Sequence, residues 1–168
     1  MRFGRRASRV RGLPEYFGEL PVVCLAEEIE TPGEGQVRAL ITIAGNPGLS
    51  TPNSGRLSRA LEGLELMVSL DVYVNETSRH ADVILPGPTP LEHPHYDLVF
   101  YQLAVRNVAN YSPPAVEAED VIPQEWETML RLTNVLAGQG ADAGHVFHAG
   151  HAGTPVPPSS ILPMSSPM

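Results

Sequence analysis

The sequence predicts an α/β protein with a partly parallel sheet and flanking helices. Three apolar segments predict strands, at residues 37–44, 66–70 and 83–85. The first is apolar on both of its faces, which is typical of a strand that is covered on both sides. Polar stretches separate the three segments, and the spacing favours parallel strands joined by right-handed crossovers.

The segments between the expected strands predict short helices. A helix over residues 54–61 has Asn53 or Ser54 as its N-cap and a short apolar stripe on one side. Residues 75–80 are polar and predict another short helix. Before the first strand, glycines and prolines leave room for one short element only, around residues 22–29.

A proline-rich loop follows the third expected strand. Residues 98–109 are apolar with polar residues interspersed, a pattern that is compatible with either a helix or a strand. Residues 123–137 carry a broad helical apolar stripe. Pro123 suits the first turn of this helix and Gly138 suits its end.

Composition divides the chain into three expected parts. Residues 1–11 form a basic arm that holds five of the eleven arginines. We interpret this arm as a solvated segment, with a targeting segment or an RNA-binding arm as the alternatives. Residues 12–137 form one domain. Residues 138–168 contain five prolines, five glycines and a single charged residue, which predicts a disordered tail.

Charge and cysteine content exclude several functions. Outside the basic arm six arginines face nineteen carboxylates, a net charge of −13, so we expect no nucleic-acid partner. No apolar run approaches the ~20 residues that span a bilayer, so we expect no membrane span and a cytoplasmic location. Cys24 is the only cysteine, which excludes an internal disulfide and an all-cysteine zinc or iron–sulfur site. Glu92, His93 and His95 match no familiar set of metal ligands.

Candidate ligand-binding residues follow the first two expected strands, at the edge where open parallel sheets bind ligands. Gly45 and Asn46 come directly after the first strand. Glycine permits a sharp turn and close approach of a ligand, and Asn46 suits either a phosphate or a loop backbone. Asp71 ends the second strand, where a carboxylate often accepts hydrogen bonds from a ribose or a nucleobase. An ordinary turn at Gly45, and an N-cap or an ion pair with Arg79 for Asp71, are the alternatives.

A second polar group, Thr77, Arg79 and Asp82, precedes the third strand. Thr77 suits a phosphate, and Arg79 would supply the cation that an anionic ligand needs. A helix-surface ion pair and a capping contact by Asp82 are the alternatives. We expect His80 to be a structural hydrogen-bonding residue. No Ser–His–Asp set and no acid–base pair of carboxylates can be proposed from the spacing, so no catalytic residue is expected here.

Taken in register, these motifs resemble the molybdopterin oxidoreductase family, which includes formate dehydrogenase, periplasmic nitrate reductase and dimethyl sulfoxide reductase. The resemblance rests on AGNP at the end of the first strand, on Asp71, and on the string ETSRHADVILP at residues 76–86, followed by Glu92. It runs from about residue 12 to residue 136 and weakens outside residues 37–96.

This resemblance implies a Rossmann-like domain that holds one end of the bis(molybdopterin guanine dinucleotide) cofactor. It implies that Gly45 and Asn46 lie along the dinucleotide phosphates and that Asp71 recognises the guanine. Thr77, Arg79 and Asp82 would complete the rim of that site.

The resemblance also implies that the molybdenum ligand and any iron–sulfur cluster belong to other parts of the family's chains. We therefore expect an incomplete domain, a fragment that binds the guanine end of the cofactor and is inactive without the missing domains. The redox chemistry of the whole enzyme would resemble that of formate dehydrogenase. The alternative is a truncated, non-catalytic binding or interaction module without cofactor.

Overall fold

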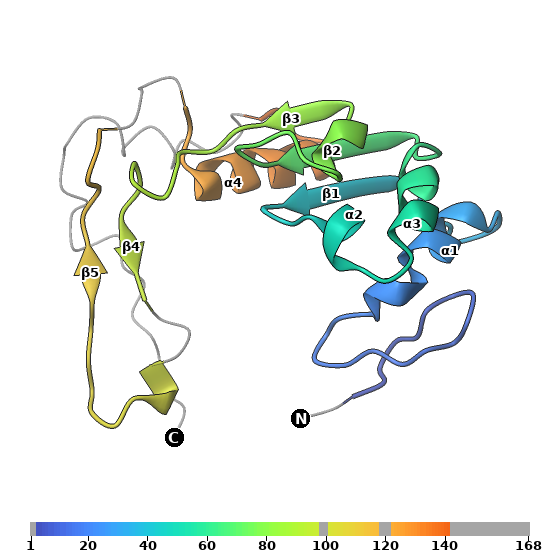
Figure 1. Ribbon diagram of the computed structural model, residues 1–168, viewed down its shortest axis with the longest axis horizontal. Helices are drawn as coiled ribbons and strands as arrows, with labels where there is room; N and C mark the ends of the chain where they lie inside the picture. The colour runs from blue at the N-terminus through green and yellow to red at the C-terminus, as the bar shows by residue number, and fades with distance from the viewer. Residues whose placement is uncertain (1–2, 98–100, 118–121, 142–168) are drawn as a thin grey trace. The chain divides into compact units, whose positions relative to one another are not determined.

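A computed structural model describes residues 3–97, 101–117 and 122–141 of the chain (Figure 1). The chain divides into two compact units, Met1–Thr89 and Pro90–Met168. The expected divisions after residues 11 and 137 remain predictions, and most of the expected tail lies outside the described residues.

The first unit is built on a three-stranded parallel sheet, which confirms the predicted fold class. The strands are β1 (Ala39–Ile43), β2 (Leu66–Leu70) and β3 (Val83–Leu85), in the order β1-β2-β3. Ile43 is in register with Leu70, and Leu70 with Leu85. Because all three strands run the same way, their carboxyl ends lie at one edge of the sheet.

Helices of the first unit are short. The 3-10 helix η1 (Val22–Cys24) runs into α1 (Leu25–Glu30), where the sequence predicts one short element. The predicted helix after Asn53 is α3 (Ser54–Leu61), with Asn53 in the N-cap position. Helix α2 (Pro47–Ser50) was not predicted. The polar stretch 75–80 forms only a 3-10 helix, η2 (Ser78–His80).

The core of the first unit lies between the helices α1 and α3 and one face of the sheet. Ala26 and Ile29 of α1, Leu57 and Leu61 of α3, and Met67 of β2 form one buried cluster. Truncating a buried leucine of this kind costs about 2–5 kcal/mol of the free energy of unfolding.

The expectation that β1 is covered on both faces is wrong. Ile41 and Ile43 point to the face opposite the α1–α3 core and remain 37% and 47% exposed. The side chains alternate along β1. Leu40 and Thr42 face the helices and are at least partly buried, whereas Ile41 and Ile43 face the other way. An apolar run therefore did not by itself show how many faces of the strand are covered.

Residues before α1 form a compact segment rich in ion pairs. Arg5 contacts Glu15, Arg9 contacts Glu28 and Arg11 contacts Glu27, at 3.2, 3.3 and 2.7 Å. The expected solvated arm thus makes ion pairs through three of its arginines. The hydrogen bond from the Arg5 side chain, together with backbone N–H donors, holds the pKa of the Glu15 carboxyl below its usual value.

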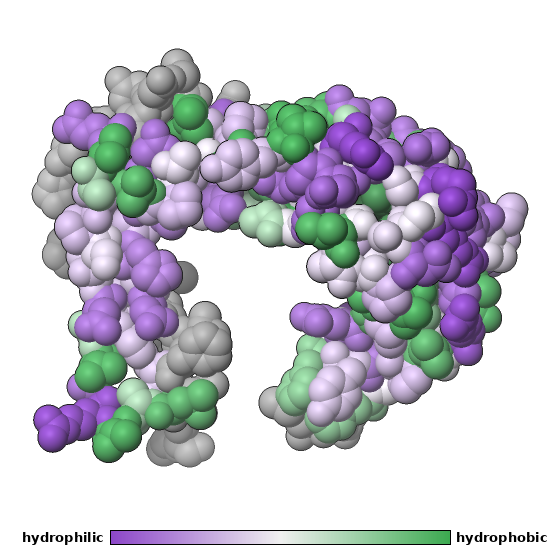
Figure 2. Space-filling model, viewed as in Figure 1, coloured by the Kyte–Doolittle hydropathy of each residue, from purple (hydrophilic) through white to green (hydrophobic). Residues whose placement is uncertain are grey.

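An exposed aromatic cluster lies on the same segment. The ring of Phe3 stacks on that of Tyr16 with centroids 4.8 Å apart, and the ring of Phe17 meets both edge-on. Tyr16 and Glu19 pair through two backbone hydrogen bonds, with Phe17 and Gly18 at positive φ in the turn between them. Figure 2 shows apolar surface at this N-terminal end of the unit.

The second unit contains a small hairpin and one longer helix. Strands β4 (His95–Tyr96) and β5 (Tyr111–Ser112) are antiparallel, with the 3-10 helix η3 (Tyr101–Leu103) between them. Of the ambiguous residues 98–109, the first three lie outside the described residues and the remainder form η3 and irregular chain.

The helix predicted over residues 123–137 is α4 (Glu125–Leu136). Its N-cap is Gln124, so Pro123 precedes the helix instead of occupying its first turn. Gly138 has φ +74° just after the helix, as predicted for a helix end. Within the described residues no helix is both long enough and apolar enough to cross a membrane.

Candidate functional site

The candidate site lies where β1 and β2 end side by side. The N–H of Ala44 donates to the carbonyl of Leu70 at 2.8 Å, so the pairing of the two strands continues to their last residues. Gly45 and Asn46 come one and two residues after Ala44, which follows β1, and Asp71 follows directly on β2. The structure therefore brings the two predicted ligand-binding loops to the same edge of the sheet.

Thr77 connects the loop after β2, in which it lies, to the loop after β1. Its side chain is fully buried, and its hydroxyl donates to Asn46 Oδ1 at 2.7 Å and accepts the N–H of Gly48 at 2.8 Å. A Cβ on Gly48 would lie 3.0 Å from both the Glu76 carbonyl oxygen and Thr77 Oγ1. Glycine is thus needed at residue 48 for this close approach, and buried Thr77 orients Asn46 from inside the protein.

Asp71 organises the loop that follows β2. Its Oδ1 accepts the N–H of Tyr73 at 3.1 Å, and its Oδ2 accepts Asn75 Nδ2 at 2.7 Å. Asn75 Oδ1 in turn accepts the N–H groups of Thr77 and Ser78 at 2.9 and 3.0 Å. A carboxylate has about four acceptor positions. Asp71 uses two of them in these hydrogen bonds, which leaves acceptor capacity on each oxygen.

Glu76 is a member of the site that the sequence reasoning missed. Asn46 Nδ2 donates to Glu76 Oε2 at 2.7 Å, and this hydrogen bond is the main reason that the pKa of the Glu76 carboxyl lies below its usual value. The only signal in the sequence was its place beside Thr77 in the ETSRHADVILP string.

Asp82 lies away from this group, and Arg79 makes its hydrogen bonds elsewhere, although its charge also helps to lower the pKa of the Glu76 carboxyl. Arg79 donates to His80 Nε2 and to Ser58 Oγ of α3, at 3.3 and 3.4 Å. Asp82 exchanges hydrogen bonds with Met67: its N–H donates to the Met67 carbonyl at 2.8 Å, and its Oδ2 accepts the Met67 N–H at 2.7 Å. Asp82 therefore lies at the amino edge of the sheet, opposite Asp71, and this position does not support a place on a common rim.

His80 has the structural role that the sequence predicts. Its Nε2 lies 2.9 Å from Ser58 Oγ, and its Nδ1 lies 4.0 Å from Glu62 Oε1. Both contacts attach the segment before β3 to α3.

The backbone turn after β1 differs from the expected one. We expected Gly45 to take the sharp turn, but Ala44 is the residue in the left-handed region, with φ 47°. This conformation costs a residue other than glycine about 1–2 kcal/mol. A Cβ on Gly45 would make only ordinary contacts, the nearest at 3.6 Å. Among the described residues, no hydrogen bond uses the N–H groups of Gly45 and Asn46.

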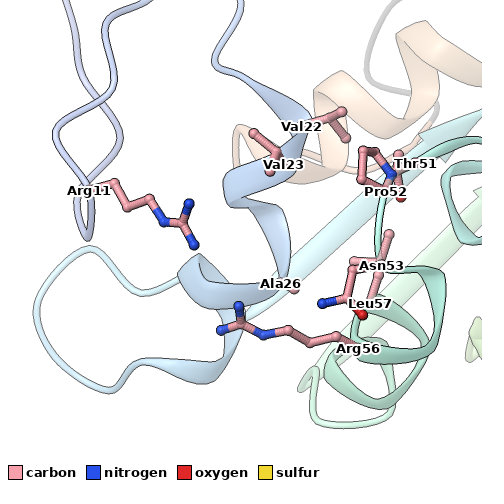
Figure 3. Close-up of a pocket in the computed structure, with 9 residues that line it drawn as sticks. All are labelled: Arg11, Val22, Val23, Ala26, Thr51, Pro52, Asn53, Arg56 and Leu57. Atoms are coloured by element: carbon pink, nitrogen blue, oxygen red, sulfur yellow. The ribbon is translucent and has the colours of Figure 1, made fainter.

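A pocket lies elsewhere in the first unit, between η1, α1 and the start of α3 (Figure 3). Arg11 and Arg56 point into it beside apolar side chains, and none of the predicted site residues lines it. Arg11 is bound to Glu27 and Arg56 to Glu30, each at 2.7 Å. Because both cations already have carboxylate partners, we assign this pocket no role.

Comparison with known proteins identifies the family of this site. The model of the molybdopterin oxidoreductase family matches residues 4–101, more than half of the chain. The chain belongs to the molybdopterin oxidoreductase family. Membership of this family implies a molybdenum cofactor, and the match includes both loops of the carboxyl edge.

Relatives match over a small part of their own length. The assimilatory nitrate reductase catalytic subunit of Bacillus subtilis is 36% identical over 66 residues, which cover 39% of this chain and 9% of the relative. The F420-dependent formate dehydrogenase 1 subunit alpha of Methanococcus maripaludis is 36% identical over 52 residues, 31% of this chain and 8% of the relative. This chain thus spans under a tenth of either protein.

A solved structure shows the same fold. Acetylene hydratase from Pelobacter acetylenicus superposes with a TM-score of 0.57 at 24% identity, over 69% of this chain and 15% of that one.

The carboxyl edge fits one end of the implied cofactor in its hydrogen-bonding chemistry. Asp71 offers charged acceptors, whereas the N–H groups of Gly45 and Asn46 offer donors to an anion. Residues 3–97, 101–117 and 122–141 hold no group of three or more His, Cys, Asp or Glu side chains that could bind a metal ion.

Proposed function

We propose that the chain binds the guanine dinucleotide end of the molybdenum cofactor at the carboxyl edge of β1 and β2. In this proposal Asp71 accepts hydrogen bonds from the guanine, and Gly45 and Asn46 contact a phosphate. Thr77 is a positioning residue, because its hydroxyl is buried against Asn46. Arg79 and Asp82 take no part in this narrower site.

One observation carries the proposal: Asp71 and Asn46 lie in the loops that follow two adjacent parallel strands, and one hydrogen-bond network connects them through Asn75 and Thr77. Such a network fixes an acceptor and a donor before a ligand arrives, which lowers the entropic cost of binding. Guanine presents two adjacent N–H donors, at N1 and the exocyclic amine, and a carboxylate is the side chain that can accept both.

When bound to a whole enzyme, the molybdenum cofactor supplies two-electron oxidation or reduction chemistry at the metal. The share that we propose for this chain is to hold and orient the dinucleotide. Formate is the default expectation for the substrate of the whole enzyme, because the motifs resemble those of the formate dehydrogenase group. We also propose that the protein is cytoplasmic and that it corresponds to part of a larger enzyme.

Binding of simple guanine ligands to the full chain tests the proposal. Isothermal calorimetry with GDP and with ADP separates recognition of guanine from recognition of phosphate, since adenine lacks the donor pair that Asp71 would accept. We expect GDP to bind more tightly than ADP in the wild-type chain. In Asp71→Ala the guanine preference should disappear, a loss of about 1.5–3 kcal/mol for hydrogen bonds to a charged group.

Glu65→Gln is the matched control, because it removes one exposed carboxylate that contacts Arg38 instead of the carboxyl edge. It should bind GDP as the wild type does. Equal affinity for GDP and ADP, or GDP binding that survives Asp71→Ala unchanged, contradicts the guanine site. Absence of binding at millimolar GDP favours the alternative function, an interaction module without cofactor.

A further inference from the structure

Glu76 places an anion against the Asn46 amide within the protein itself. The Glu76 carboxylate accepts Asn46 Nδ2 at 2.7 Å, and the Thr77 hydroxyl donates to Asn46 Oδ1 at 2.7 Å. These two contacts fix which end of the amide faces which partner. Asn46 therefore presents its NH2 group to a negatively charged oxygen, the same type of acceptor as a phosphate oxygen.

The two partners of Asn46 differ in burial. Thr77 is fully buried and also bound to the N–H of Gly48, so it cannot leave without opening the loop. Glu76 is exposed, and its side chain can move into water at little cost. The amide consequently keeps its orientation when the carboxylate departs.

We propose that Glu76 is a specificity-determining residue of the carboxyl edge, whose carboxylate occupies the phosphate position on Asn46 and must leave before a phosphate binds. This inference rests on the proposed function, which places the phosphate there. A ligand that carries guanine without phosphate contacts Asp71 alone and does not compete with Glu76. Glu76 therefore lowers the affinity for phosphorylated ligands and leaves the affinity for guanosine unchanged.

The other charges near this position do not replace Glu76. Asp71 is engaged by Tyr73 and Asn75. Arg79 donates to Ser58 and His80, and its positive charge also helps to lower the pKa of the Glu76 carboxyl, so it is a cation near this position and no substitute for the Glu76 anion. Removing the Glu76 charge therefore changes the one anion that is bound to Asn46, and it leaves the carboxylate that faces the guanine in place.

Calorimetry with guanosine and with GDP, on the full chain, tests this role in Glu76→Gln and Glu76→Ala. Glutamine keeps an acceptor for Asn46 without the charge, and alanine removes both. We expect both variants to bind GDP about two- to fivefold more tightly than the wild type, the range for one exposed ionic contact. Guanosine affinity should stay the same in all three proteins. The gain for GDP should shrink at high salt, because an exposed charge is screened.

Glu65→Gln serves as the charge-matched control and should show no gain for GDP. Unchanged or weaker GDP binding in both Glu76 variants, with guanosine bound as in the wild type, overturns the inference and makes Glu76 a support for Asn46. Failure of every protein, wild type included, to bind guanosine and GDP overturns the proposed function and this inference with it. The guanosine measurement therefore separates the two failures.

Discussion

Asp71 and Asp82 are the same type of residue at opposite edges of one sheet, and their partners differ. Asp82 exchanges two hydrogen bonds with the backbone of Met67, whose side chain lies in the core. Within the described part of the chain, the side-chain hydrogen bonds of Asp71 stay in its own loop, with Tyr73 and Asn75. An aspartate bound to a buried strand stabilises the fold, whereas one that orders an exposed loop and keeps spare acceptors suits a ligand.

The same contrast holds for the loops around them. At the carboxyl edge, Thr77, Asn46 and Glu76 form side-chain hydrogen bonds between segments that are about 30 residues apart in the sequence. At the amino edge, the contacts besides Asp82 include the backbone bond from Glu65 to Arg38 and an exposed ion pair between the same residues. Hydrogen bonds between side chains of distant segments thus gather at the carboxyl edge.

Thr77→Val should give the largest effect, because the buried hydroxyl has two partners. Valine keeps the shape of threonine but leaves the Gly48 N–H and Asn46 Oδ1 without a hydrogen bond. We expect a loss of about 2–3 kcal/mol in the free energy of unfolding, measured with urea, and weaker GDP binding.

Thr77→Ser keeps the hydroxyl and is the control for that change. It should retain most of the stability and the GDP affinity of the wild type. If serine and valine destabilise the chain equally, packing of the threonine methyl group matters more than the hydrogen bonds, and the carboxyl edge loses its distinctive feature.

The paired substitutions Asp82→Ala and Asp71→Ala test the comparison directly. Asp82→Ala leaves the Met67 N–H without its side-chain partner, and we expect a cost of about 1–3 kcal/mol in unfolding free energy with unchanged GDP affinity. Asp71→Ala should show the reverse pattern, a smaller stability change and a lost guanine preference. Urea unfolding and calorimetry on both variants measure the two quantities.

Asp82→Asn offers the matched control, since its amide oxygen can still accept the Met67 N–H. It should recover much of the stability that Asp82→Ala loses. If Asp82→Ala weakens GDP binding under conditions where the variant is folded, Asp82 belongs to the binding site.

How far the sequence predicted this arrangement depends on the element. Strands β2 and β3 have the predicted bounds because each is a largely apolar run with clear boundaries: Glu65 and Asp71 lie on either side of β2, and Asp82 and Pro86 lie on either side of β3. Helix α2 was missed because Pro47 and Gly48 are typical of turns. Yet proline suits the first position of a helix, and Gly48 is required by its contact with Thr77 and Glu76. Tertiary contact, absent from a local pattern, decided that segment.

The candidate site was predicted in part for a topological reason. Carboxyl ends of neighbouring parallel strands meet, so Asn46 and Asp71 were placed together from sequence. The same rule separates Asp82 from them, because the crossover from β2 must bring the chain back to the amino edge before β3 begins. Asp82 is close to Thr77 in the sequence, which suggested instead that the two residues belong to one cluster. Burial of Thr77 and the contact of Glu76 with Asn46 depend on side-chain packing, which the sequence pattern did not contain.

The smallest expected effect is that of acid on the free energy of unfolding, and its direction follows from the lowered pKa of Glu76. The Asn46 hydrogen bond holds the folded-state pKa of Glu76 below the unfolded value of about 4.3. Its contribution to stability is therefore fully present above that unfolded pKa and is lost as the pH falls through the folded-state pKa. We expect the stability difference between wild type and Glu76→Gln, from urea unfolding at about pH 3 to 6, to narrow on the acid side. A stability difference that stays constant over this pH range would show that Asn46 does not stabilise the charged form of Glu76.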